Sequence, residues 1–159
     1  MAPVSGSPVK ELILDDLQDT ALPLLIANSD YYTTVEIIQR IDAGPMEIKM
    51  FPAIIIVPLS TDYEREGTRG TLTISASYRI QLSLFLRTRT DAASKIERFI
   101  RDVHKAVLID RYRDGNALNT RLTSDEVFYP QEDDEPYTTA TCILEVDYRS
   151  EWDDLNQPT

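Results

Sequence analysis

Residues 72–86 read LTISASYRIQLSLFL. Every even-numbered position carries an apolar or aromatic side chain, and every odd-numbered position except Phe85 carries Thr, Ser, Arg or Gln. Alternation with a period of two is typical of a strand with one buried face and one solvated face. The stretch exceeds the usual strand length of about 3–10 residues. We therefore expect its end to project beyond the body of the domain, or a bulge to bend it.

Four further strands are expected around this one. Residues 51–58, FPAIIIVP, are apolar on both faces and flanked by prolines, which predicts a buried strand. Shorter strands are expected at residues 35–41 and 121–129. Residues 137–149 alternate again, with one apolar face made by Ala140, Cys142, Leu144, Val146 and Tyr148.

Two amphipathic helices are also expected. Apolar residues between 9 and 25 recur at helical spacing, Ser7 and Pro8 mark the start, and Pro23 predicts a kink or an end. The second helix follows Thr90-Asp91, which we expect to cap it. Its apolar stripe consists of Ala92, Ile96, Phe99, Ile100, Val103, Ala106 and Val107.

The predicted order of elements is α-β-β-β-α-β-β. The simplest packing is an α+β two-layer sandwich, with a mostly antiparallel sheet and both helices on its apolar face. A length of 159 residues predicts a single domain, with a core over about residues 8–150 and a polar tail over 151–159. The solvated face of the sheet then offers Thr, Ser, Arg and Gln side chains to something outside.

Counts of reactive residues argue against common catalytic chemistry. Cys142 is the sole cysteine and His104 the sole histidine, so we expect no internal disulfide, no Cys/His zinc site and no nucleophile triad. Cys142 is in phase with the core, and His104 is expected at a surface or edge. We predict no catalytic, cofactor-binding or metal-binding residues. The acidic turn Glu132-Asp133-Asp134-Glu135 lacks the ligand spacing of a calcium loop.

No apolar run approaches the roughly 18 residues that a membrane span needs, and the N-terminal residues lack the pattern of a signal peptide. We therefore expect a cytosolic product with no membrane partner. The net charge of −11 argues against the basic footprint of an ordinary nucleic-acid binder.

The charge is divided unevenly along the chain. Residues 125–159 hold eleven acidic residues and one basic residue, whereas residues 87–113 hold eight basic and four acidic residues. Opposed stretches favour contact between copies, although a solubilising acidic tail is the plain alternative. The residues predicted at such a subunit interface are Arg98, Arg101, Arg111, Arg113, Glu132, Asp133, Asp134 and Glu135.

Residues 59–70 are polar, charged and contain two glycines, which predicts a long exposed connection between strands. It is either a plain surface loop or an arm that orders on a neighbouring ring of protein. The candidate contact residues in it are Asp62, Tyr63, Glu64, Arg65 and Glu66.

The arrangement of these elements resembles the tail terminator proteins of long-tailed bacteriophages. The similar pieces are an early helix with Leu12-Ile-Leu14, the apolar strand 52–58, the long strand 78–86, a helix that begins Thr90-Asp-Ala-Ala, and the late strand 141–149. The resemblance covers roughly residues 8–150.

The resemblance implies a structural virion protein, found in the host cytoplasm during assembly and then in the tail or neck. Such proteins form a homohexameric ring at the head-proximal end of the tail tube, stop its polymerisation and offer a docking face to the head-completion or connector protein. DNA only passes through the ring. Three alternatives stay open: a head-tail joining or neck protein, a small-molecule-binding regulatory α+β domain, and a small enzyme, which the residue counts disfavour.

Overall fold

A five-stranded sheet forms one layer of the molecule. The computed structural model describes residues 8–27, 30–41, 48–66, 73–88, 90–130 and 137–151. The strand order is β1-β2-β3-β5-β4, in which β1 runs parallel to β2 and all other neighbours are antiparallel. The strands are β1 (Ile37–Arg40), β2 (Ala53–Glu66), β3 (Thr73–Arg87), β4 (Asn119–Phe128) and β5 (Tyr137–Glu151).

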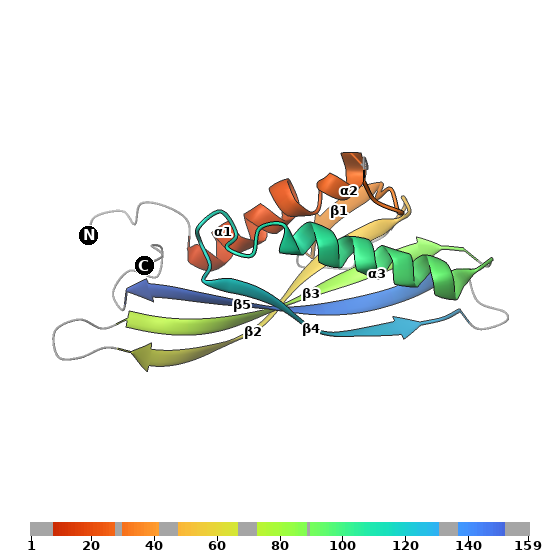
Figure 1. The fold of residues 1–159 in the computed structure, drawn as a ribbon. Coiled ribbons are helices and arrows are strands. Elements are labelled where there is room, and N and C mark those ends of the chain that lie inside the picture. Colours follow the sequence, from red (N-terminus) through yellow and green to blue (C-terminus); the bar gives the residue numbers. More distant parts are fainter. Residues whose placement is uncertain are drawn as a thin grey trace.

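The central strand β3 confirms the alternation of its sequence. Its even-numbered side chains from Ile74 to Leu84 are buried, and its odd-numbered side chains lie on the other face of the sheet. β5 alternates in the same register, because each residue of β3 lies opposite a β5 residue that points to the same face. The sheet therefore has one apolar face and one face that no described element covers (Figure 1).

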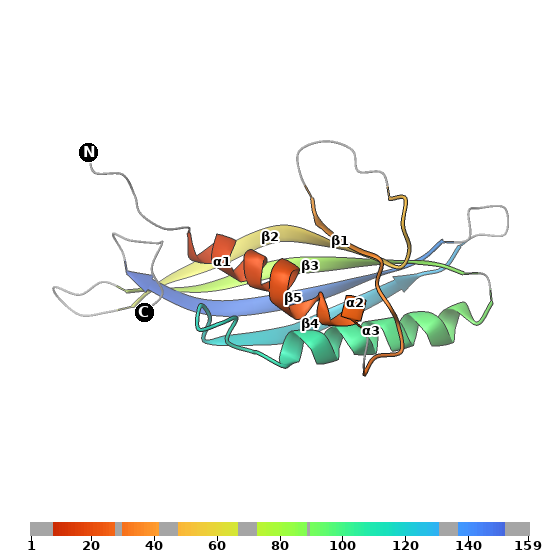
Figure 2. The ribbon, with the colours of Figure 1, turned by 90° about the horizontal axis from the view of Figure 1, so that it is seen from above.

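The helices form the second layer, all on the apolar face of the sheet (Figures 1 and 2). α1 (Val9–Asp16) continues into a π-helical turn (Leu17–Ala21), and α2 (Leu24–Ala27) follows. The predicted break at Pro23 is confirmed: the N–H of Leu22 bonds the Leu17 carbonyl at 3.0 Å, and Pro23 offers no N–H to continue the helix.

The second long helix is α3 (Ala92–Leu108). Its predicted apolar stripe is buried from Ile96 to Val107, and it packs over β3, β4 and β5. The predicted side-chain cap is wrong, because Asp91 has a left-handed backbone (φ 54°) and makes no capping hydrogen bond. Together the elements confirm the predicted α+β fold and its order, with the core between the two layers.

The prediction that residues 59–70 form a loop is wrong for residues 59–66. These residues are the second half of β2, where Thr61–Glu66 pair with Tyr78–Thr73 of β3. A bulge between Pro58 and Thr61 separates the two halves. Pro58 is tolerated there because β1 pairs with β2 only as far as Ile56, so no ladder bond needs its missing N–H. Residues 67–70 lie outside the described part of the chain.

Of the two outcomes expected for the long strand, the projection is present, and β3 itself pairs with β5 without a bulge. The ends of β2, β3 and β5 reach past the start of α1 in both views (Figures 1 and 2). β2 carries a bulge, and β4, at the opposite edge of the sheet, carries a second irregularity between Leu122 and Ser124. The projecting end leaves side chains on the open face of the sheet, well away from α3.

Candidate functional site

A group of cations and tyrosines covers the outer side of α3. Its members, which we call the basic patch, are Tyr31, Tyr32, Lys95, Arg98, Arg101 and Lys105. The Arg98 guanidinium lies 5.5 Å from the Tyr32 ring centre, and the Lys105 ammonium lies 5.0 Å from that of Tyr31. Both distances suit cation–π attraction, which holds the charged groups over the rings.

The tyrosines reach α3 because their segment is tied to the helix. The Asp102 carboxylate, only 2% exposed, accepts a 2.7 Å hydrogen bond from the backbone N–H of Thr33. The Lys105 ammonium donates to the Asp30 carbonyl at 3.2 Å. Asp102 thus fixes residues 30–33 beside the row of cations, and the patch is built by two segments far apart in sequence.

Within the part of the chain that the structure describes, the basic patch has no neutralising ion pair. Among the residues described, no carboxylate forms an ion pair with Lys95, Arg98, Arg101 or Lys105. Tyr32 is 67% exposed and borders three separate hollows along α3. A surface that combines exposed aromatic area with unpaired cations is suited to contact with an acidic protein surface.

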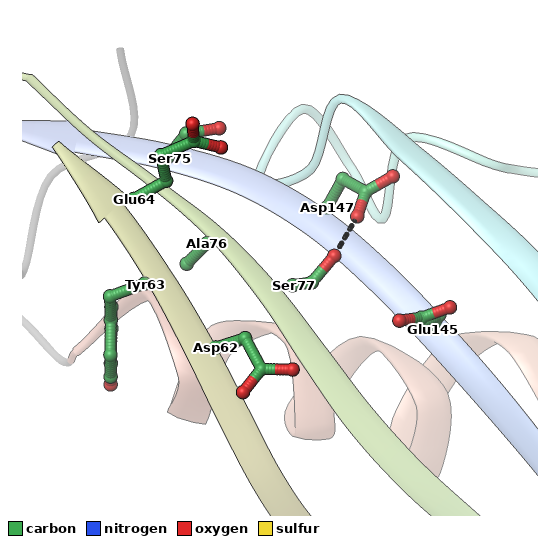
Figure 3. Close-up of a pocket in the computed structure, with 8 residues that line it drawn as sticks. All are labelled: Asp62, Tyr63, Glu64, Ser75, Ala76, Ser77, Glu145 and Asp147. Atoms are coloured by element: carbon green, nitrogen blue, oxygen red, sulfur yellow. Dashed lines mark hydrogen bonds between the residues drawn. The ribbon is translucent and has the colours of Figure 1, made fainter. Parts of the chain in front are cut away.

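A second candidate surface lies on the open face of the sheet, at its projecting end. Its members, which we call the acidic face, are Asp62, Glu64, Ser75, Ser77, Glu145 and Asp147 (Figure 3). Strand register explains the grouping: Asp62 lies opposite Ser77, and Ser77 lies opposite Asp147 on its other side. These side chains line a shallow hollow of about 430 Å³. The same register places two arginines on this face, Arg149 opposite Ser75 and Arg79 opposite Glu145.

The carboxylates of the acidic face differ in their partners. Ser77 donates a hydrogen bond to Asp147 (Figure 3), and the Arg121 guanidinium lies 3.3 Å from both Glu145 and Asp147. Asp62 and Glu64, both exposed, form no ion pair or hydrogen bond with another described residue. Their two negative charges are therefore available to an external cation.

The structure places the predicted arm residues on both faces of the sheet. Asp62 and Glu64 point to the open face, whereas Tyr63 points to the helix side, where its hydroxyl lies 3.4 Å from the Lys10 ammonium (Figure 3). Arg65 and Glu66 belong to β2, and their side chains fall outside the described part. These residues therefore form part of the sheet and not a separate arm.

The predicted interface residues divide into three groups. Arg98 and Arg101 lie on the basic patch, and Arg111 is exposed beyond α3, with its guanidinium 5.6 Å from the Tyr112 ring centre. Arg113 is fully buried, so its predicted place on a surface is wrong. The acidic turn Glu132, Asp133, Asp134 and Glu135 lies outside the described residues.

Arg113 holds the chain after α3 against the first helix. Its guanidinium donates to the Val107 carbonyl and lies 3.3 Å from the carboxylate of Asp16, which is 8% exposed. Burial raises the pKa of Asp16, and the charge of Arg113 opposes that rise. This pair is a part of the core, and it tethers the turn at residues 110–116 to α1.

The two residues singled out for reactivity have inert surroundings. Cys142 is fully buried, and burial raises its pKa to about 12, so the thiol stays protonated at neutral pH. His104 is half-buried on α3, where burial lowers its pKa against the opposing charges of Asp125 and Glu97. Within the described ranges, no three His, Cys, Asp or Glu side chains gather closely enough to hold a metal ion. No helix in that part has the length and apolarity to cross a membrane.

Comparisons with known proteins add little beyond these observations. No family model matches the chain, and no curated protein matches it. Among solved structures, a chain of the virion of a native gene transfer agent particle is similar, with a TM-score of 0.45 and 8% sequence identity over 90% of this chain and 96% of that chain. A TM-score and an identity this low compare only the outlines of the two folds, and no conclusion on function rests on the similarity.

Proposed function

We propose that the protein is a ring-forming structural subunit of a phage-like particle, and specifically a tail terminator. Two groups of charges carry the proposal, and neither has an oppositely charged partner among the described residues. The cations of the basic patch belong to the helix layer, and Asp62 and Glu64 belong to the sheet. The likeness of the element order to tail terminators, stated above from the sequence, supplies the specific role.

The placement favours head-to-tail assembly. The exposed cations of the basic patch belong to α3 in the helix layer, and the acidic face belongs to the side of the sheet that the helices leave open (Figure 1). A two-fold dimer joins two copies through the same surface of each, so two surfaces that face in opposite directions cannot both be covered in it. Heterologous contact of this kind closes into a ring when the rotation between neighbours permits.

In the proposed role, one side of the ring matches the end of the tail tube, and the other side does not reproduce the surface on which the next tube ring docks. Polymerisation of the tube then stops, and the exposed side receives the head-completion protein. DNA passes through the hole without specific contact. Function in this proposal resides in surfaces, and no residue of the chain acts as a catalyst.

The first experiment measures assembly. The purified chain is examined by light scattering and negative-stain imaging, and a hexamer of the 18.1 kDa chain has a mass of about 109 kDa. Rings with a central hole are expected. A stable monomer at high concentration would contradict the ring and with it the proposed function.

The second experiment is genetic. In an infection that lacks the protein, tails of excessive or irregular length that fail to join heads are expected. Tails of normal length that fail to join would favour the head-tail joining protein instead. Normal infectious particles would remove both assembly roles and leave the regulatory domain and the small enzyme as the remaining candidates.

A further inference from the structure

We propose that, within the ring inferred above and therefore resting on that function, the basic patch of one subunit docks on the acidic face of the next. The occupant of each surface is thus a second copy of the same chain. The inference names the contact that closes the ring, and it replaces the acidic turn at residues 132–135 with the carboxylates at the projecting end of the sheet.

Charge is the first reason. Four cations of the patch have no carboxylate partner among the described residues, and Asp62 and Glu64 have no cationic partner there. Arg98 and Arg101 extend from consecutive turns of α3, so their charges lie in a row along the helix. Asp62 and Glu64 extend from alternate positions of β2 to the same face, so their charges also lie in a row.

Geometry is the second reason. The basic patch lies on the helix layer, and the acidic face lies on the opposite side of the molecule at the far end of β2, β3 and β5 (Figures 1 and 3). A cation of the patch cannot reach the acidic face of its own chain through the core. Among the described residues, the cations of the patch and the carboxylates of Asp62 and Glu64 have no partner of opposite charge, and a head-to-tail arrangement supplies one at every contact.

An exposed tyrosine of the basic patch supplies apolar contact area, which the charges do not. Exposed ion pairs contribute little to affinity, so they select the partner and its register while apolar contact holds it. Tyr32, 67% exposed, offers a large ring beside Arg98 for that apolar contact. Tyrosine and arginine are both enriched at protein interfaces.

Two charge reversals test the pairing. One variant carries Arg98→Glu and Arg101→Glu, and the other carries Asp62→Lys and Glu64→Lys. Each variant alone faces like charges across every contact, so each is expected to lose the ring at concentrations where the unmodified chain keeps it. An equimolar mixture is expected to restore rings, because alternating subunits pair a reversed patch only with a reversed face.

A matched control keeps the result interpretable. Asp19→Lys with Glu36→Lys makes the same change in charge as the β2 variant at exposed positions outside both surfaces, and it is expected to leave the ring intact. Circular dichroism and the thermal midpoint establish that each variant folds. If a reversal prevents folding, the milder pairs Arg98→Gln with Arg101→Gln and Asp62→Asn with Glu64→Gln take its place, with weakened assembly expected.

The outcomes separate this inference from the function on which it rests. A monomeric unmodified chain overturns both. Intact rings in both reversal variants, or variants that dissociate and are not rescued by mixing, overturn the docking inference and leave the ring standing. If the patch variant keeps its ring and fails only to attach to tail tubes, the patch faces the tube protein, and the self-docking inference is also overturned.

Discussion

The buried pair of Arg113 and Asp16 allows a quantitative test of the core. Arg113 is fully buried and Asp16 is 8% exposed, so each charge relies on the other for compensation. Removing one partner of a buried ion pair typically costs about 3–5 kcal/mol, because the remaining charge is left without compensation. We expect Arg113→Met and Asp16→Leu each to lower the free energy of unfolding by that amount.

The double variant is expected to behave differently. Arg113→Met with Asp16→Leu removes both charges and leaves apolar side chains of similar length in the core. The Arg113 Nε and Nη1 atoms make no hydrogen bond with another described residue, so the native pair is only partly compensated. Replacement of such a pair by apolar residues is often neutral, or stabilising by about 1–4 kcal/mol. We therefore expect the double variant to be at least as stable as the parent chain.

Urea unfolding followed by circular dichroism measures all four proteins. For a chain of this length, a loss of about 3–5 kcal/mol lowers the melting temperature by about 6–20 °C. The double-mutant cycle gives the coupling energy of the pair directly. If the two single losses add in the double variant, the charges do not compensate each other, and our description of this contact is incorrect.

Three further predictions concern single residues. The backbone N–H of Asp114 above all, with that of Tyr112, holds the pKa of Asp110 below its usual value, so the stability that this carboxylate contributes is present above about pH 4 and is lost as the pH falls further. Asp110→Ala should therefore lower the free energy of unfolding by about 1 kcal/mol at pH 7. If the urea midpoints of variant and parent differ as much at pH 3 as at pH 7, this prediction is contradicted. Cys142 should react with a thiol reagent only as fast as the chain opens; labelling that is unaffected by stabilising solutes would refute its burial. Asp102→Ala should lower the free energy of unfolding by about 1–3 kcal/mol, because the buried carboxylate accepts a hydrogen bond from the Thr33 N–H. It should also increase hydrogen exchange at residues 30–34, and unchanged exchange there would contradict the tether.

The sequence predicted best where one strand or helix has one buried face. β3 and α3 carry a periodicity long enough to identify their type, because burial on one face imposes it on every second or every third to fourth residue. The second half of β2 was missed, because Pro58 and a run of charged residues are typical of loops. The length of β3 was the available clue, since a strand of 15 residues needs partners of similar length.

The candidate surfaces were only partly predictable, for a different reason. Arg98 and Arg101 could be placed on the outside of a helix from their spacing alone. Arg113 was expected beside them, yet its partner Asp16 lies in another helix that no local pattern connects to it. The acidic face joins residues of β2 and β5 through the order of strands in the sheet, and that order is a property of the fold.

The interruptions in β2 and β4 protect the sheet from uncontrolled growth. Beyond Ile56, β2 has no strand on its outer side among the described residues, and β4 forms the opposite border. Open borders of this kind recruit strands from other molecules and lead to fibrous aggregates. A proline at the irregularity in β2, the charged side chains that follow it and the shifted register in β4 all disfavour such recruitment. Backbone addition is thereby discouraged at both borders, and recognition of other molecules is left to side chains on the two broad faces.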